Sequence, residues 1–340
     1  MNGLIGFTLS FLLVYMIGNI MIAGQSFFIP FLIALIISYF IIAIAEWVKK
    51  MIRVPMFFAY ILAILGIVLF FYVVSTIVTG NVQSLIELAP SYQQKFETLI
   101  DAVFEKFHLP EPNLKDIFGE FNFGSVVGSI AFMIRDVASS MGMITLYVIF
   151  IMFEYHYFHD KMQALFQTQR GLESAEMIVS KVAKKTQAYL RLKTLLSILT
   201  ATLSYGLMVA VGVDFAEFWA LLIFFLNYIP TIGSIVATVF PCLLTILQFE
   251  SIWPFAIITA GLISMQFIIG NIVEPRVMGK QFNLSGLVIL VSLTVGGMIW
   301  GITGMFLCVP ILMIISIILA SFSQTRPVAV LLSQTGNLEE

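Results

Sequence analysis

Long apolar runs separated by short charged gaps are the dominant pattern along the chain. A helix needs about 20 apolar residues to cross about 30 Å of hydrocarbon, so most of these runs predict a membrane span. The first run holds two spans with a break at Gly24-Gln25-Ser26, and further spans are predicted near 56–79, 138–158, 194–213 and 252–272. The runs without any Asp, Glu, Lys or Arg are 1–45, 54–86, 137–153, 194–213, 218–249, 251–273 and 281–325.

Two of these runs, 218–249 and 281–325, contain helix-breaking residues near their middle. Proline removes a backbone donor and clashes with the preceding turn, and the roughly nine residues before the first break reach only about 14 Å. Both runs therefore predict helical hairpins that enter the membrane and turn back. The alternative is that both are ordinary membrane spans with a kink, in the wall of a static channel. The interrupting residues are Asn227, Pro230 and Gly233 in the first run and Gly296, Gly297, Gly301 and Gly304 in the second.

The tips of such hairpins are candidates for a solute pathway. Backbone groups at membrane depth are tolerated only where protein buries them or where they line a wet cavity. Apolar segments interrupted by glycine or proline in two parts of a chain are the best sequence indication of a transporter site near the bilayer midplane. If the first hairpin opens outward and the second inward, the two have inverted topology.

Between the third and fourth spans, apolar residues recur every three or four positions among polar ones. This spacing predicts an amphipathic helix from about Leu85 to Phe107, ended by Pro110-Glu111-Pro112. A second, shorter stripe from Ile117 to Ile134 leads back to the membrane. These stripes either cover each other, lie on the lipid surface or pack against a neighbouring subunit.

The charged gaps alternate in sign, which predicts the orientation. Lys49, Lys50 and Arg53 place the 46–55 loop in the cytoplasm, because basic residues are enriched in cytoplasmic loops. Segment 80–136 has eight acids against four bases and is expected outside, whereas segment 154–193 has seven bases against four acids and is expected inside. Both chain termini are then cytoplasmic. The basic 159–193 segment is expected to lie beside anionic lipid headgroups.

Composition agrees with a membrane class, since 60% of the 340 residues are hydrophobic and only 11% are charged, against roughly 25% charged in soluble proteins. The predicted fold is an all-α integral membrane protein with about eight membrane-inserted helical segments, two of them broken or re-entrant hairpins, plus an external amphipathic segment. No Lys or Arg precedes Lys49, which favours a retained first span over a signal peptide. The expected layout is spans one to three at 1–79, the external segment at 80–137, span four at 138–158, a cytoplasmic basic helical linker at 159–193, a transport core at 194–323 and a cytoplasmic tail at 324–340.

A short charged gap, GNIVEPRVMGKQFNLSG, separates the last full span from the second hairpin. It is interpreted as a cytoplasmic joint in which Pro275 stops one helix and Asn283 or Ser285 caps the next. The charges either pair locally or act only as a positive-inside anchor. The residues of this joint are Glu274, Pro275, Arg276 and Gly279, with Lys280 beside them.

The stretches NYIPTIGS, from Asn227 to Ser234, and GNIVEPRVMGKQFNLSGLVILVSLTVGGMIWGITGMFLCVP, from Gly270 to Pro310, resemble the autoinducer-2 exporter family of bacterial membrane proteins. The resemblance is strongest over about 190–320, and the order of spans agrees from residue 1. It implies a multi-pass permease of the bacterial inner membrane. It implies export of the quorum-sensing molecule autoinducer-2 or a related signal, with Na⁺ or Li⁺ exchange for H⁺ as the alternative within the family.

Neutral polar side chains in the second half suit a small, uncharged polar solute. A proton relay would be expected to place a carboxylate deep in the membrane, yet the acids here lie near the ends of spans. The alternative role of the same polar residues is to form hydrogen bonds between helices. The predicted pathway residues are Asn227, Pro230, Thr231, Gly233, Ser234, Gln266, Asn271, Thr294, Gly297, Trp300, Gly301 and Thr303.

Enzyme chemistry is not indicated. An intramembrane enzyme would need a nucleophile with a base, paired aspartates within a span or an H-E-x-x-H helix, and the spans carry none of these. Cys242 and Cys308 lie in apolar runs without metal-ligand spacing, and His156 and His159 fit an interfacial aromatic belt. We therefore expect no cofactor, metal or nucleic acid. The expected partners are a small solute, the bilayer, a coupling ion (H⁺ or Na⁺) and further copies of the chain, with a non-transporting accessory role as the alternative.

Overall fold

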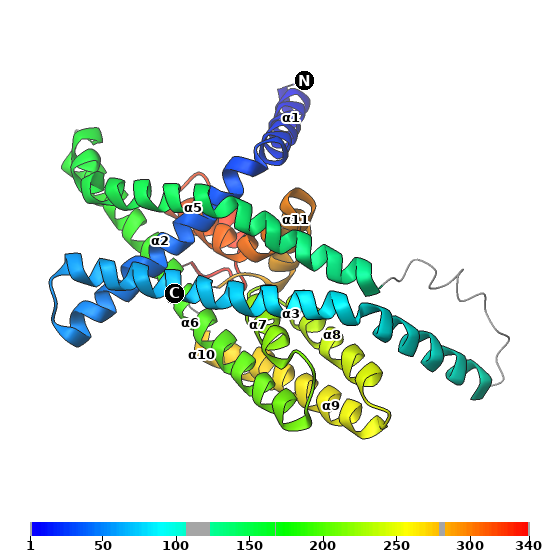
Figure 1. The fold of residues 1–340 in the computed structure, drawn as a ribbon. Coiled ribbons are helices and arrows are strands. Elements are labelled where there is room, and N and C mark those ends of the chain that lie inside the picture. Colours follow the sequence, from blue (N-terminus) through cyan, green and yellow to red (C-terminus); the bar gives the residue numbers. More distant parts are fainter. Residues whose placement is uncertain (1, 107–122, 167, 279–282, 339–340) are drawn as a thin grey trace. The chain divides into compact units, whose positions relative to one another are not determined.

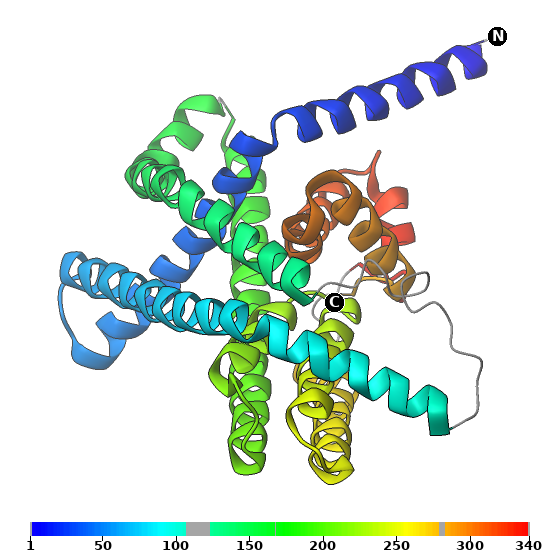
Figure 2. The ribbon, with the colours of Figure 1, turned by 45° about the vertical axis from the view of Figure 1, so that its right-hand side comes forward.

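The structure, a computed structural model, describes residues 2–106, 123–166, 168–278 and 283–338. All regular elements in these ranges are helices, and the only β-type pairing among them is an isolated antiparallel bridge between Leu284 and Ser333. The all-α fold is thus confirmed (Figures 1 and 2). The α-helices are α1 Asn2–Ala23, α2 Gln25–Ile52, α3 Met56–Lys106, α5 Phe123–Leu165, α6 Gln169–Val211, α7 Ala216–Leu226, α8 Ile232–Gln248, α9 Ile252–Ile268, α10 Glu274–Met278, α11 Gly286–Ser321 and α12 Arg326–Leu332, with one π-helical turn, η1 Ile269–Val273.

Six of the described helices are long and apolar enough to cross a membrane, and two shorter apolar helices, α7 and α8, accompany them. This agrees with the prediction of about eight membrane-inserted segments. Many large apolar side chains are more than half exposed, for example Phe57, Leu69 and Trp253. A soluble protein rarely exposes so many large apolar side chains, and lipid is the solvent that suits them.

Two helices are longer than the spans that the sequence predicts within them. The third span and the amphipathic segment after it form one helix of 51 residues, α3, which continues through Pro90. The fourth span is likewise continuous with the residues that precede it, because α5 begins at Phe123. The predicted helix end at Pro110-Glu111-Pro112 lies outside the described residues.

The chain divides into two compact units, and each carries one of the predicted hairpins. One unit comprises Met1–Ile64, Ser140–Lys193 and Val277–Glu340, and the other comprises Leu65–Ser139 and Thr194–Arg276. We call them the α11 unit and the α7–α9 unit after their hairpin regions. The sequence layout did not anticipate this grouping, which combines segments far apart in the chain.

The α7–α9 unit has an apolar core formed by α7, α8 and α9 with parts of α3 and α6. Helices α7 and α8 run side by side and α9 packs along α8 (Figure 1). Trp219 and Phe240 stack with ring centroids 6.2 Å apart, and Ile223, Leu244 and Ile258 are fully buried around them. This packing fixes the position of the first hairpin.

In the α11 unit, α11 contacts α1, α2 and α12. Regular helical geometry is interrupted inside α11 at Trp300 and Gly301, and the helix doubles back there (orange in Figure 2). Aromatic contacts reinforce this unit: Phe27 and Phe31 both meet the ring of Tyr147 edge to face at 5.8 Å.

Candidate functional site

The first hairpin has a short arm, a strained tip and a longer arm. Helix α7 has 11 residues and α8 has 17, which at about 1.5 Å per residue correspond to roughly 16 Å and 25 Å. The shorter arm is too short to cross the hydrocarbon layer, as the sequence indicates. Gly233 lies against the carbonyl of Leu226 on the opposite arm, where a Cβ atom would overlap that oxygen.

Thr231 adopts a backbone conformation that side chains normally avoid. Its φ is +60° and its ψ is −60°, and the N–H of Ile232 donates to the carbonyl of Pro230 at 2.6 Å. This is a γ-turn with positive φ, a rare and strained form. Such strain persists only where the surroundings enforce it, and it concentrates at functional sites. The hydroxyl of Ser234 donates to the carbonyl of Thr231 at 2.8 Å and secures the turn.

Two polar contacts hold the base of this tip to α6. The side-chain amide of Asn227 donates to the hydroxyl of Ser197 at 3.1 Å, and the hydroxyls of Thr194 and Tyr228 lie 2.6 Å apart. Asn227 and Tyr228 are both buried. The prediction singled out Asn227 but missed its partner on α6.

Ser197 belongs to a polar stripe that the sequence prediction did not identify. Ser197, Thr200 and Ser204 are fully buried and recur at helical spacing on α6, so they share one face. Thr200 donates to the carbonyl of Leu196 at 2.8 Å within its own helix. The signal available in the sequence was this i, i+3, i+7 spacing of small hydroxyl residues inside an otherwise apolar span.

The end of α9 contributes a further irregular segment to the same unit. The π-helical turn Ile269–Val273 contains Asn271, whose amide donates to the carbonyl of Phe267 at 3.2 Å. Turns of this type occur frequently at functional sites. The side-chain nitrogen of Gln266, one turn earlier, is buried and has no hydrogen-bond partner among the residues that the structure describes. Because buried polar groups are normally hydrogen-bonded, this amide is a candidate to bind a water or a solute hydroxyl.

The second hairpin, in the α11 unit, turns on glycine. Gly301 has φ +60° and ψ −140°, a region accessible essentially to glycine only. Gly296 and Gly304 lie against each other's backbone across the turn. In a continuous helix these positions would be about 12 Å apart, so their contact demonstrates two antiparallel arms.

Trp300 lies at this turn but is buried rather than open. Its indole N–H donates to the carbonyl of Met21 on α1 at 2.9 Å, and its ring stacks near Phe28 with centroids 6.4 Å apart. The other predicted pathway residues of this hairpin are Gly297, which faces Met305, Thr294, whose hydroxyl donates to the carbonyl of Leu290, and Thr303, which is half-buried.

The charged joint differs from the prediction in one respect. Pro275 does not stop a helix, because α10 runs from Glu274 to Met278 and includes both Pro275 and Arg276. The helical stretch runs without interruption from Ile252 to Met278, and the π-helical turn Ile269–Val273 changes its hydrogen bonding directly before the proline. Gly279 and Lys280 lie outside the described residues.

The caps proposed for the helix after this joint are only partly as predicted. Ser285 is the N-cap residue of α11, although its side chain makes no capping hydrogen bond. The side chain of Asn283 binds the C-terminal segment instead. It accepts from the N–H of Thr335 at 3.2 Å and donates to the carbonyl of Asn337.

The predicted pathway residues therefore fall into two groups, each within one unit. Asn227, Pro230, Thr231, Gly233 and Ser234 form the tip of the first hairpin, with Gln266 and Asn271 on the α9 segment of the same unit. The residues of the second group lie around the turn of α11, namely Thr294, Gly297, Trp300, Gly301 and Thr303.

An all-helical membrane fold with two interrupted apolar hairpins is characteristic of a membrane transporter. A family model described as AI-2E family transporter matches residues 9–324, so the chain belongs to this family. The chain is 28% identical over 319 residues to the AI-2 transport protein TqsA of Escherichia coli (strain K12), which covers 90% of this chain and 89% of TqsA. It is also 28% identical over 320 residues to a provisional transport protein of Haemophilus influenzae, with 92% and 90% covered.

Proposed function

We propose that the protein is a secondary transporter that exports a small polar solute, with autoinducer-2 as the leading candidate. Membership of the transporter family and the similarity to TqsA support this class of solute. The observation that carries the proposal is that both apolar hairpins break at non-helical backbone, at Thr231 and at Gly301. Backbone of this kind at membrane depth belongs beside a solute route or inside protein.

In the proposed mechanism, the tips Asn227–Ser234 and Gly296–Gly304 guard the route. Alternating access moves one hairpin-bearing unit with respect to the rest of the chain. Neutral groups such as the Asn227 amide and the buried Gln266 amide would exchange hydrogen bonds with hydroxyl groups of the solute. The protein would lie in the bacterial inner membrane as a homo-oligomer with both termini in the cytoplasm, and H⁺ or Na⁺ would couple the movement.

The test is uptake into everted membrane vesicles that contain the protein. Vesicles are energised and supplied in parallel with autoinducer-2 or with Na⁺ or Li⁺ under an H⁺ gradient. We expect autoinducer-2 to accumulate, and Pro230→Ala and Gly301→Ala variants to insert normally but to lose accumulation. If the vesicles exchange Na⁺ or Li⁺ for H⁺ without taking up autoinducer-2, the transported species is the ion and not autoinducer-2. If neither autoinducer-2 uptake nor ion exchange is measured, the transport role is rejected.

A further inference from the structure

The part of α3 that follows the predicted third span carries a buried apolar stripe. Val78, Val82, Leu85, Ala89 and Tyr92 are each at most 9% exposed and recur every three or four residues. Residues at this spacing share one face of a helix. The sequence predicts such a stripe from about Leu85 onward but leaves open whether a second stripe, the lipid surface or a neighbouring subunit covers it.

The α7–α9 unit covers this stripe within the same chain. Val82, Leu85 and Tyr92 belong to the buried apolar core of that unit, the cluster that also contains residues of α7 and α8. Phe96, one turn further along α3, is partly buried against the same cluster. Figure 1 shows α3 crossing the α7–α8 hairpin. The apolar face of α3 is therefore fitted to the hairpin that carries the tip Asn227–Ser234.

A polar contact is added to this apolar packing at Tyr92. Its hydroxyl donates to Oδ2 of Asp214 at 3.0 Å, although the two residues are 122 positions apart in the chain. Asp214 lies in the short turn between α6 and α7, just before the first residue of α7. A hydrogen bond to a carboxylate is roughly twice as strong as one between neutral groups. Tyr92 therefore binds α3 to the start of the first hairpin.

The end of the first hairpin is tied to the same turn. The side-chain nitrogen of Gln248, the last residue of α8, donates to the carbonyl of Gly212 at 2.9 Å, and its side-chain oxygen accepts from the N–H of Asp214 at 2.9 Å. The turn has left-handed backbone at Gly212 and Phe215, with φ of +83° and +59°. Tyr92, Asp214 and Gln248 thus form one hydrogen-bonded chain that joins α3, the start of α7 and the end of α8.

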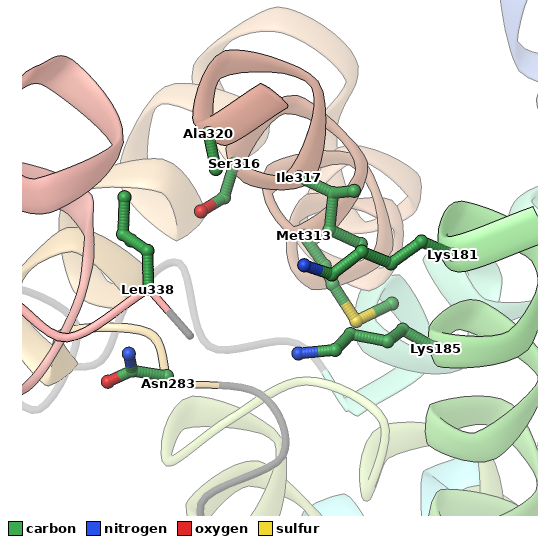
Figure 3. Close-up of a pocket in the computed structure, with 8 residues that line it drawn as sticks. All are labelled: Lys181, Lys185, Asn283, Met313, Ser316, Ile317, Ala320 and Leu338. Atoms are coloured by element: carbon green, nitrogen blue, oxygen red, sulfur yellow. The ribbon is translucent and has the colours of Figure 1, made fainter. Parts of the chain in front are cut away.

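The second hairpin is tied at its base by a different element, the C-terminal segment. The N–H of Ser285, the residue before α11, donates to the carbonyl of Leu332 at 2.9 Å. Figure 3 shows Asn283 and Leu338 lining one recess together with Ser316 on the second arm of α11. The base of this hairpin is therefore closed by backbone pairing with the chain's own end, whereas the base of the first hairpin is held by side chains.

We propose that Tyr92 positions the first hairpin by holding the turn before α7, and thereby determines the position of the tip Asn227–Ser234. This inference rests on the proposed function, in which that tip guards the solute route. Helix α7 has only 11 residues, about 16 Å, and packed side chains and rigid helices carry coupling between distant sites. A shift of the turn therefore reaches the tip. Tyr92 acts through Asp214 and is a positioning residue.

The first experiment measures uptake of autoinducer-2 into everted vesicles by Tyr92→Phe, Asp214→Ala and the double variant. Tyr92→Phe keeps the buried ring and removes only the hydroxyl. We expect each single variant to raise KM about fivefold at an unchanged maximal rate per folded transporter, because a displaced tip binds the solute less well. A merely structural role would reduce the amount of folded protein without raising KM. The double variant should be no worse than either single variant, because both changes remove the same contact.

Two matched variants test whether the contact itself is responsible. Asp214→Asn retains a side-chain oxygen that accepts from the Tyr92 hydroxyl, so its KM should return to within about twofold of the wild-type value. Tyr205→Phe is the same chemical change at an exposed tyrosine of α6, and it should leave KM unchanged. A wild-type KM for Tyr92→Phe, or additive effects of Tyr92→Phe and Asp214→Ala, would overturn the proposal.

Hydrogen exchange of the full-length protein tests the contact without any solute. We expect amides of α7 and of the tip to exchange about tenfold faster in Tyr92→Phe and Asp214→Ala, whereas those of α11 keep their rates. Absence of uptake by the wild type, together with this exchange pattern, would reject the proposed function but not the contact that holds the hairpin. Unchanged exchange of α7 and the tip in both variants would overturn the positioning role, whatever the vesicles transport.

Discussion

The two hairpins break their helices in different ways, although the apolar runs that encode them look alike. The α7–α8 tip carries proline, threonine and asparagine, and it combines a strained turn at Thr231 with hydrogen bonds to α6. The α11 turn carries glycine instead, and its arms meet backbone to backbone at Gly296 and Gly304. In the first tip, hydrogen bonds to α6 add to the close packing at Gly233, whereas the second depends mainly on the contact between Gly296 and Gly304 and on one hydrogen bond from Trp300 to Met21. Substitutions should therefore distinguish them.

The largest effect is expected where a methyl group would enter the opposite backbone. Gly233→Ala in the first hairpin and Gly304→Ala in the second each force a Cβ atom into a carbonyl group. We expect a loss of about 3 kcal/mol in stability and no transport, because backbone cannot move aside as a side chain can. Thermal unfolding of the purified variants and vesicle uptake measure both effects. Normal uptake by either variant would mean that its two arms do not pack as described.

A smaller loss, confined to the first hairpin, is expected for Ser197→Ala. This change leaves the buried amide of Asn227 without its acceptor, which costs about 1 to 3 kcal/mol. The matched control is Thr200→Ala, which removes an equally buried hydroxyl that bonds only within its own helix. We expect a lower unfolding midpoint for Ser197→Ala than for Thr200→Ala. Equal midpoints would show that the contact with the tip contributes nothing.

A gain in stability is expected for Thr231→Gly. Glycine adopts positive φ without the steric penalty that threonine has, and release of the strain should contribute about 1 kcal/mol after the entropy cost of glycine. Thr231→Ser retains the Cβ atom and should unfold at the wild-type temperature. If the turn is strained for function, Thr231→Gly should be more stable and slower in uptake. An unchanged midpoint for both variants would argue against strain at this position.

The smallest effect is expected for Gly297→Ala. The added methyl group would meet only the end of the flexible Met305 side chain, so the change should cost less than about 1 kcal/mol. Unfolding and uptake should both remain near wild type. Loss of uptake with normal stability would instead place Gly297 on the solute route, as the sequence predicts.

The sequence predicted the positions of both breaks because proline and clustered glycine act locally on the backbone. The break between α1 and α2 at Gly24 follows from the same reasoning. Proline was a less reliable signal for the end of a helix, because it also occurs inside helices. Pro275 was wrongly expected to end a helix, but it lies inside the helical stretch from Ile252 to Met278. Pro90 likewise lies inside α3 without ending it.

Tertiary contacts could not be predicted in the same way. The stripe of Ser197, Thr200 and Ser204 was missed because a hydroxyl group in a membrane helix can bond to its own backbone, so its presence does not reveal its partner. Trp300 was placed at a tip by its glycine neighbours, but only the fold reveals that its indole binds Met21.

The anchoring of residues 332–337 to Asn283 and its neighbours affects how this protein should be labelled. A fluorescent reporter or affinity handle joined directly after the last residue would pull on a segment that pairs with the start of α11. A long, flexible spacer, or a handle at the opposite terminus, would leave that pairing undisturbed, and deletion from Ser333 onward would uncover the N–H and carbonyl groups that it now satisfies.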